Sequence, residues 1–428
     1  MFYKQTIRDI DLEGKTVLLR ADYNVPLSSG KITDDYRIRQ SLPTIEYLLS
    51  KNVKLIICSH LGRPDGKVNK ELSLAPIAKK LEKLLGKKVE FVDDCIGVKV
   101  KKAANALKGK DILLLENLRF YLQEEKNDKN FAKSLSSIAE VFVQDGFGVV
   151  HRAHASTEGV THFLPSVSGL LLEKEVDVIT NVMENPQRPL MAIVGGAKIE
   201  DKIEIIKRFI KIADFLAVGG ALANPFLVAK GVDVKQSLMD KSEVQTAKEV
   251  LKEANAESKL RNFVFSVPHD SVVATKIDKT ARTRIVDFSS NSFADIINYP
   301  GRVPESETKL NAAEKILDIG PFSASFIAGA VQLSATVVWN GTMGVTEIDG
   351  LQGPIGPFSH GTQTVIEALV GDLGHKPFSL VGGGDTVGYV EKRKIMDGFD
   401  HVSTGGGASL ELICGHKLPG VEALMDKI

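Results

Sequence analysis

The segment TVLLRADYN, residues 16–24, is a short apolar run that ends in polar side chains. Three similar runs follow it in the first half of the chain: VKLIICSH (53–60), KDILLLEN (110–117) and EVFVQDGFG (140–148). Between them lie amphipathic stretches such as LAPIAKKLEKLLG (74–86), whose apolar residues recur at the spacing of one helical face. Short apolar strands that alternate with helices predict βαβ units and a parallel sheet.

The second half of the chain repeats this alternation. Its apolar runs are RPLMAIVGG (188–196), ADFLAVGG (213–220), NFVFSVPHD (262–270), ATVVWNG (335–341), PFSLVGGGD (377–385) and HVSTGGG (401–407). We therefore expect an α/β fold with two doubly wound, Rossmann-like parallel-sheet domains. The first covers residues 1–167, residues 168–186 form an interdomain helix, and the second begins at residue 187. The polar stretch 280–312 has weak periodicity and is expected to be a surface excursion.

The composition excludes several classes of protein. The 428 residues carry 54 Lys and Arg against 54 Asp and Glu, with 6% aromatic residues and one Trp, which argues against a nucleic-acid partner. No apolar run approaches the ~18–20 residues of a membrane span. Three cysteines are too few for a disulfide framework, which favours a reducing, cytoplasmic location. The charge is unevenly spread, since residues 1–180 hold 28 Lys and Arg against 24 Asp and Glu.

Ligands of parallel sheets bind beyond the carboxyl ends of the strands, so the residues that follow each apolar run are candidates for the site. In the first half these are Asp22, Asn24, His60, Arg63, Arg119 and Arg152. Guanidinium groups bind phosphate and carboxylate through paired donors, so this set predicts a site for a small, multiply anionic ligand. The alternative is that the arginines form ion pairs with loop carboxylates.

The strand ends of the second half carry glycines instead, at 195–196, 219–220, 341, 382–384 and 405–407. Glycine lets backbone N–H groups approach phosphate oxygens closely. Lys198 and Lys202 are four residues apart, so on a helix they would share a face and reach a polyphosphate. Alternatively, both are solvated surface lysines. Asp385 is the candidate ligand of a magnesium ion, or else part of a helix cap.

Several familiar enzyme signatures are absent. The chain has no G-x-x-x-x-G-K-[ST], no H-R-D-L-x-x-x-N, no G-x-S-x-G and no strand-linked G-x-G-x-x-G. The stretch HRAH (151–154) has no supporting cluster of cysteines or carboxylates, so no metal role is expected for it. The arginines of the first domain and the glycines, lysines and Asp385 of the second favour a phosphotransferase that binds a small anion on one domain and a magnesium nucleotide on the other. Such an arrangement predicts an active-site cleft that closes by hinge bending.

The chain resembles phosphoglycerate kinases. The matching motifs run in family order: RADYNVPL (20–27), DDYRIRQSLPTI (34–45), SHLGRP (59–64), ENLRF (116–120), DGFGVVHRAHASTEGV (145–160), GGAKIEDKI (195–203), VVWNGTMGV (337–345), GGGDT (382–386) and STGGGASLELICG (403–415). The resemblance implies phosphoryl transfer between 1,3-bisphosphoglycerate and ADP, with Mg²⁺, to give 3-phosphoglycerate and ATP in glycolysis. It also implies a cytoplasmic monomer, a nucleotide-binding domain over 187–403, and a segment 404–428 that returns to the N-terminal domain.

The resemblance assigns roles to residues by motif. The glycerate substrate would be bound by Asp22, Asn24, Arg37, His60, Arg63, Arg119 and Arg152. The nucleotide would be bound by Gly196, Ala197, Lys198, Lys202, Gly341, Glu347, Gly383, Gly384, Asp385 and Thr386, with Asp385 at the magnesium. Arg37, Lys198, Gly383 and Gly406 would act on the transferred phosphoryl group.

The chain also departs from the usual family pattern, at 342–347, 219–223, Pro225, His269 and Phe322. We expect these changes to surround the adenosine pocket, so the same reaction with another nucleotide preference is one alternative. A catalytically silent relative that acts as a binding protein is the other. The retention of Arg37 and Lys198 argues against the silent relative.

Overall fold

The computed structural model describes residues 2–28, 30–288 and 308–427. The chain divides into two units, here called unit 1 (Met1–Asn181 with Thr404–Ile428) and unit 2 (Val182–Ser403). Within the described ranges, no helix has the length and apolar character needed to cross a membrane.

Unit 1 is built on a parallel sheet of six strands, in the order β5-β6-β4-β1-β7-β8. The predicted segment 16–24 supplies its strand β1, which pairs in parallel with β4 on one side and β7 on the other. The strand bounds are β1 (Thr16–Arg20), β4 (Lys54–Cys58), β5 (Glu90–Val92), β6 (Ile112–Leu115), β7 (Val141–Gln144) and β8 (Ser166–Ser168). A small antiparallel pair, β2 (Leu27–Ser28) and β3 (Lys31–Ile32), lies outside this sheet.

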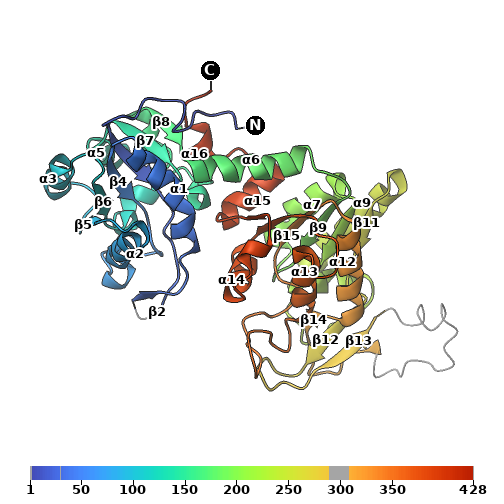
Figure 1. Cartoon of the computed structure of the whole chain (residues 1–428). Helices are drawn as coiled ribbons and strands as arrows, with labels where there is room; N and C mark the ends of the chain where they lie inside the picture. The colour runs from blue at the N-terminus through green and yellow to red at the C-terminus, as the bar shows by residue number, and fades with distance from the viewer. Residues whose placement is uncertain (1, 29, 289–307, 428) are drawn as a thin grey trace. The chain divides into compact units, whose positions relative to one another are not determined.

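Alternate residues of these strands enter two different cores, because successive side chains of a strand point to opposite faces. Leu19 belongs to a core that α1 and α2 cover, whereas Leu18 belongs to a core that α3 and α5 cover. Helices therefore lie on both faces of the sheet, as Figure 1 shows. This confirms the predicted doubly wound arrangement for unit 1.

The helices of unit 1 are α1 (Tyr36–Ser50), α2 (Ala75–Leu85), α3 (Val98–Ala106), α4 (Leu122–Glu125), α5 (Lys129–Ser136), α15 (Gly406–Cys414) and α16 (Pro419–Glu422). Short 3₁₀ helices are η1 (Lys70–Leu72), η2 (Leu118–Phe120), η3 (Phe147–Val149) and η4 (Gly159–His162). Helix α6 (Leu170–Glu184) runs through the division at residues 181 and 182. It begins two residues later than predicted, because Ser168 still belongs to β8 and pairs with Gln144.

Unit 2 contains a second parallel sheet, in the order β11-β10-β9-β15-β16-β17. Its strands are β9 (Leu190–Val194), β10 (Phe215–Val218), β11 (Val264–Ser266), β15 (Thr336–Asn340), β16 (Phe378–Gly382) and β17 (His401–Val402). Every residue of the central strands β9 and β15 is buried, as expected of a sheet that is covered on both faces. This confirms the prediction of a second parallel-sheet domain.

The helices of unit 2 are α7 (Ile203–Ile212), α8 (Asn224–Ala229), α9 (Glu243–Leu260), α12 (Pro321–Leu333), α13 (His360–Val370) and α14 (Gly384–Lys392), with 3₁₀ helices η5 (Glu200–Lys202), η6 (Ala221–Ala223) and η7 (Met396–Gly398). Helix α7 buries Ile205, Ile206, Phe209 and Ile210 and lies against β9 and β10. Helices α12 and α13 pack against each other.

A three-stranded antiparallel sheet in unit 2 is not part of the predicted fold. It has the order β13-β12-β14, with β12 (Asp270–Ala274), β13 (Arg284–Asp287) and β14 (Lys315–Ile319). The run 262–270 therefore contains one parallel strand and the start of a second, antiparallel one. Part of the expected surface excursion 280–312 forms β13, and residues 289–307 of it lie outside the described residues.

The segment 404–428 belongs to unit 1 together with the first residues of the chain. Lys4 and Asp426 form an isolated antiparallel β-bridge, and the Gln5 N–H donates to the Met425 carbonyl at 2.8 Å. The buried Glu175 of α6 accepts hydrogen bonds from the Thr404 N–H at 2.6 Å and from the Thr404 hydroxyl at 2.7 Å. These contacts fix the start of the segment to α6 and its end to the N-terminal residues.

Candidate active site

A polar cavity of about 280 Å³ lies at the carboxyl ends of the strands of unit 1. Its lining includes all seven residues predicted to hold a small anion: Asp22, Asn24, Arg37, His60, Arg63, Arg119 and Arg152. It also includes Gly148, His151, His154, Gly406 and Gly407, of which only the glycines at 406 and 407 were among the predicted phosphate-binding positions. The structure therefore brings together side chains from β1, α1, β4, η2 and the loop after β7.

Hydrogen bonds within this cavity hold the arginines in place. Arg37 Nη1 donates to Asp22 Oδ2 at 3.0 Å and to the Asn24 carbonyl at 3.1 Å. Arg119 Nη1 donates to the Gly62 carbonyl at 2.9 Å, and its Nε lies 3.2 Å from Glu125 Oε1. The ion-pair alternative is thus partly correct for these two arginines. Neither Arg63 nor Arg152 has an ion pair within the part of the chain that the structure describes, and both side chains are exposed.

The histidines of the cavity are held neutral by burial and by the arginine charges. Burial, followed by the charges of Arg20 and Arg119, lowers the pKa of His154 to about 4. Burial is also the main cause that lowers the pKa of His60 well below its usual value. Because the histidines stay uncharged near pH 7, the positive potential of the cavity comes from its guanidinium groups.

One glycine of the cavity is required by packing. A Cβ atom at Gly148 would lie 2.2 Å from Asp22 Oδ2, so any side chain there would displace the carboxylate that holds Arg37. The motif DGFG contains this glycine, but its spacing alone does not reveal the contact, because Asp22 lies 126 residues earlier in the sequence.

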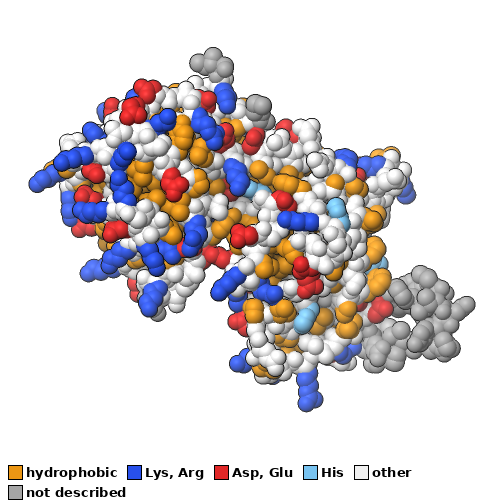
Figure 2. Space-filling model, in the orientation of Figure 1, with side chains coloured by type: hydrophobic (Ala, Val, Ile, Leu, Met, Phe, Trp, Pro, Cys, Tyr) orange, Lys and Arg blue, Asp and Glu red, His pale blue; other side chains and the backbone are white. Residues whose placement is uncertain are grey.

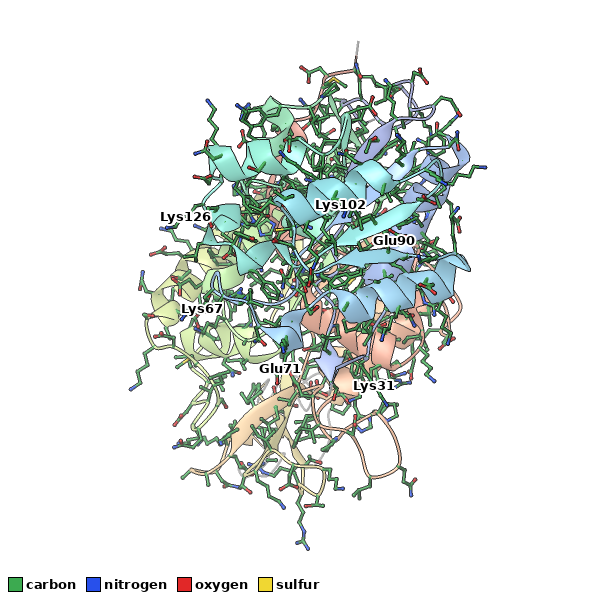
Figure 3. All side chains as sticks on the ribbon, turned by 90° about the vertical axis from the view of Figure 1, so that its left-hand side faces the viewer. Lys31, Lys67, Glu71, Glu90, Lys102 and Lys126 are labelled. Carbon is green, nitrogen blue, oxygen red and sulfur yellow. The ribbon has the colours of Figure 1, made fainter. Side chains whose placement is uncertain are left out.

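The positive charge of the first 180 residues is only partly in the cavity. Lys and Arg side chains are spread over the surface around α2 and α3 (Figure 2). Lys67, Lys102 and Lys126 are exposed and project from one side of unit 1 (Figure 3). The net excess of charge is therefore spread over the surface of unit 1 (Figure 2), whereas the arginines at the strand ends line the cavity.

A second cavity, of about 410 Å³, lies in unit 2. The predicted nucleotide residues Gly196, Ala197, Glu347 and Asp385 line it. Its less polar walls come from Leu227, Leu238, Ile277, Leu317, Met343 and Val345, and its lining also includes the buried polar residues Asn224, Ser271 and Asp318. Burial raises the pKa of Asp318 to about 8, although the Gly361 and Ile319 N–H groups donate to its carboxylate.

The other predicted nucleotide residues do not line this cavity, and most of them lie close to the carboxyl ends of β9, β15 and β16. Lys202 Nζ donates to the Gly195 carbonyl at 2.7 Å, and to the carbonyl and Oδ1 of Asn340 at 3.1 and 2.6 Å. The Gly341 N–H donates to the Thr386 hydroxyl at 2.7 Å. Gly341 and Gly383 have φ values of +101° and +93°, which favour glycine.

Two expectations about this site are wrong. Lys198 and Lys202 do not share a helical face, because Lys198 lies in the bend before η5 and α7 starts only at residue 203. Lys198 is exposed, whereas Lys202 donates hydrogen bonds to Gly195 and Asn340. The changes from the family pattern also do not all surround the cavity. Ala221, Ala223, residues 342–345 and Glu347 contribute to its lining, whereas Pro225 does not. His269 and Phe322 contact each other instead, with ring centroids 5.6 Å apart.

Asp385 lies in the first turn of α14 and is exposed, and Gly383 is the N-cap residue. The described residues contain no cluster of three or more His, Cys, Asp or Glu that could hold a metal ion by itself. A single carboxylate at a helix N-terminus fits a hard cation that takes its other ligands from phosphate and water. The arrangement therefore fits a magnesium ion that arrives with a nucleotide.

Comparison with known proteins shows to which family the chain belongs. The phosphoglycerate kinase family model matches residues 7–416. The chain belongs to the phosphoglycerate kinase family. It is 45% identical over 424 residues to the phosphoglycerate kinase of Moorella thermoacetica, covering 99% of this chain and 100% of that protein. It is 40% identical over 430 residues to that of Pelotomaculum thermopropionicum, covering 99% and 100%.

Solved structures agree with the family assignment. The phosphoglycerate kinase of Coxiella burnetii matches with a TM-score of 0.80 and 33% identity, covering 98% of each chain. That of Pyrococcus horikoshii matches with a TM-score of 0.77 and 29% identity, covering 99% of this chain and 98% of that one. The resemblance inferred from the motifs is confirmed.

Proposed function

We propose that the chain catalyses phosphoryl transfer between 1,3-bisphosphoglycerate and ADP, which gives 3-phosphoglycerate and ATP, as a kinase of glycolysis. Family membership over nearly the full length carries this proposal. The presence of an arginine-lined cavity in unit 1, and of a cavity in unit 2 that Gly196, Ala197 and Asp385 line, supports it. The altered segments 219–223 and 342–347 give no reason to prefer a silent binding protein.

In this proposal unit 1, with its returning segment 404–428, holds the glycerate substrate. Asp22 and Asn24 orient Arg37 and the loop at Gly62, since the Gly62 N–H donates to Asn24 Oδ1 at 2.9 Å. The exposed guanidinium groups of Arg63 and Arg152 are available to a phosphate or carboxylate. Arg119 and His60 complete the set from the buried side of the cavity.

Unit 2 holds the nucleotide. Gly196, Gly383, Gly384 and Thr386 would present backbone donors to its phosphates, and Gly341, whose N–H donates to the Thr386 hydroxyl, would lie next to them. Lys202 keeps the Gly195 and Asn340 strand ends together, while the exposed Lys198 is free to reach the terminal phosphate. Ala197 lines the cavity and Glu347 stands at its wall, where a ribose hydroxyl would find an acceptor. Asp385 would hold Mg²⁺, which supplies charge neutralisation for the phosphates when it is bound.

The chemistry needs no general base. The acceptor in the direction of ATP consumption is a carboxylate, which is ionised at pH 7. Catalysis then consists of alignment and of neutralising the charge on the transferred group. Arg37, Lys198 and the amides of Gly383 and Gly406 would supply that charge and those donors. Because the two ligands are held by different units, turnover requires the units to bring them into line.

Two further parts of the proposal concern the state of the protein. We assign the chain as a monomer, as the family resemblance implies. We assign it to the cytoplasm, because its three cysteines are free and two of them are buried.

A coupled assay tests the proposal. Purified protein is given 3-phosphoglycerate and Mg²⁺ with ATP or GTP in turn, and formation of 1,3-bisphosphoglycerate is followed. Activity with ATP is expected. Activity with GTP alone would show that the changes at 219–223 and 342–347 alter base preference. No activity with either nucleotide, from a protein that shows cooperative unfolding, would refute the enzyme assignment and favour the binding protein.

A further inference from the structure

Arg20 is the last residue of β1 and lies directly behind the cavity of unit 1. It is 1% exposed and is among the largest fully buried side chains of the protein. Burying a guanidinium group costs free energy unless its donors are paired, so a buried arginine is expected to have hydrogen-bond partners and a structural or functional role. It does not line the cavity itself.

Every described contact of Arg20 fixes its guanidinium group. Its Nε donates to the Ser156 hydroxyl at 2.8 Å, and its Nη1 donates to the Ala21 carbonyl. The Ser156 hydroxyl and N–H in turn donate to Oε1 and Oε2 of Glu124 at 2.5 and 3.0 Å. Glu124 is fully buried, so the arginine is anchored through Ser156 to a buried acid.

The remaining nitrogen of Arg20 faces His60. Arg20 Nη2 lies 3.2 Å from His60 Nδ1. A guanidinium nitrogen can only donate, so His60 Nδ1 must accept and therefore carries no proton. The nearest carboxylate oxygen, Asp22 Oδ1, is 3.9 Å from the same nitrogen, which is too far for a hydrogen bond. A neutral imidazole without a proton on Nδ1 carries it on Nε2.

We propose that Arg20 is a positioning residue that fixes His60 as its Nε2–H tautomer, so that the ring presents a hydrogen-bond donor to the anionic substrate. The tautomer follows from the geometry of Arg20 and His60 alone. Only the use of the donor for 3-phosphoglycerate rests on the proposed function. The His60 ring is then a neutral hydrogen-bond donor, next to the surrounding arginines, whose orientation is fixed before the substrate binds.

The surroundings of His60 keep this donor independent of pH. Arg20 from β1, Arg37 from α1, Arg119 from η2 and the neutral His154 from the loop after β7 all face the ring. Burial and the arginine charges lower its pKa well below the ordinary value, and Asp22 is the carboxylate nearby, with its Oδ1 3.9 Å from Nδ1. Protonation at Nδ1 would also place two donors against each other at Arg20 Nη2.

Nuclear magnetic resonance of the free full-length chain tests the tautomer. Protein labelled with ¹⁵N-histidine is examined by long-range ¹H–¹⁵N correlation, and His60→Gln identifies the signals of residue 60. We expect an unprotonated Nδ1 and a protonated Nε2 throughout the range of about pH 6 to 8 in which an ordinary histidine titrates. A protonated Nδ1, or a titration of His60 within that range, would overturn the proposal whether or not the protein is active.

Kinetic variants test the use of the donor. A glutamine amide nitrogen reaches the position of Nε2 and an asparagine amide nitrogen that of Nδ1. His60→Gln should therefore keep the KM for 3-phosphoglycerate within about threefold, whereas His60→Asn should raise it roughly tenfold, as for loss of a hydrogen bond to a charged group. Equal effects of the two variants would contradict the assignment of the donor.

The role of Arg20 is tested by Arg20→Met combined with Glu124→Leu, which removes both buried charges and avoids leaving one unpaired. We expect a KM for 3-phosphoglycerate raised roughly tenfold, an unchanged KM for ATP, and mixed tautomer signals for His60. Arg8→Met is the matched control, because Arg8 is 53% exposed, pairs with Glu173 and lies outside the cavity. If His60 keeps a single Nε2–H tautomer in the double variant, the role of Arg20 is refuted. If the double variant does not fold, the histidine spectrum of the unmodified protein decides, and a protonated Nδ1 of His60 there refutes the proposal.

Discussion

Gly341 and Gly231 offer a matched pair of substitutions by alanine. Both have φ in the region that favours glycine, at +101° and +92°. Around Gly231 no atom lies within 4 Å of where a Cβ would be. A Cβ on Gly341 would lie 2.1 Å from the Gly195 carbonyl oxygen, 2.4 Å from the Gly195 carbonyl carbon and 2.6 Å from Lys202 Nζ. The two variants therefore share the backbone strain and differ in the steric clash.

The expected magnitudes follow from this difference. Backbone strain of a non-glycine residue costs about 1–3 kcal/mol, so Gly231→Ala should lower the free energy of unfolding by that amount. Overpacking adds about 1–3 kcal/mol, so Gly341→Ala should lower it by about 2–6 kcal/mol. Atoms in contact prefer a separation of about 3.5 Å, so the Gly195 carbonyl must move by roughly 1 Å or more. That movement breaks the hydrogen bond between Gly195 and Lys202 at the end of β9.

Urea unfolding and steady-state kinetics measure both effects. Trp339 is the one tryptophan of the chain, it is fully buried, and its Nε1 donates to the Gly341 carbonyl at 2.8 Å. Its fluorescence therefore reports the unfolding of unit 2. Gly341→Ala should raise the KM for ATP roughly tenfold, as for loss of a charge-assisted hydrogen bond, whereas Gly231→Ala should leave it unchanged. Equal losses of stability with normal kinetics in both variants would refute the steric argument.

Three other predictions concern single side chains. Arg37→Ala should lower kcat about 100- to 1,000-fold with little effect on the KM for ATP, whereas Arg39→Ala, an exposed neighbour paired with Asp35, should leave steady-state kinetics nearly normal. Asp318 keeps its proton in the folded chain up to about pH 8, whereas the unfolded chain releases it near pH 4. Stability should therefore fall as the pH rises from about 4 to about 8, and Asp318→Asn should flatten that fall in urea unfolding at several pH values; an unchanged slope would contradict the raised pKa. Thr386→Val removes the acceptor of the Gly341 N–H and should cost about 1–3 kcal/mol in urea unfolding, while Thr386→Ser should restore most of that loss if the hydroxyl is what matters.

The parallel sheets and the grouping of arginines in one cavity were predictable because both depend on local signals. An apolar run such as 16–20 specifies a buried strand, and the polar residue that follows it lies at the carboxyl end. The topology then brings Asp22, His60 and Arg119 together, because adjacent parallel strands end at the same edge. The prediction required only the rule that ligands bind at the carboxyl ends of parallel strands, and not the order in which the strands pair.

Other features were not predictable because they depend on distant partners. Strand β8 is only three residues long and exists because β7 pairs with it. The antiparallel sheet β12 to β14 pairs residues as far apart in sequence as Ser271 and Ile319, and β13 has a mixed polar sequence with no clear periodicity. Lys198 and Lys202 have helical spacing, but the glycines before them delay the start of α7. Arg20 occurs in a family motif, yet nothing in its spacing shows that Ser156 and Glu124 bury it.

The assignment of residues 404–428 to unit 1 has a consequence for biosynthesis. A ribosome makes residues 1–181 first, but the strands and helices formed by them lack α15, α16 and the partners of Lys4 and Gln5 until the last stretch is translated. Unit 2 is a continuous stretch and is complete as soon as residue 403 has left the exit tunnel. Domains generally acquire structure as whole units during synthesis. The unit whose synthesis starts first is therefore completed last, and a released chain that lacks residues 404–428 should carry a native cavity in unit 2 together with an incomplete arginine-lined cavity in unit 1 that lacks Gly406 and Gly407.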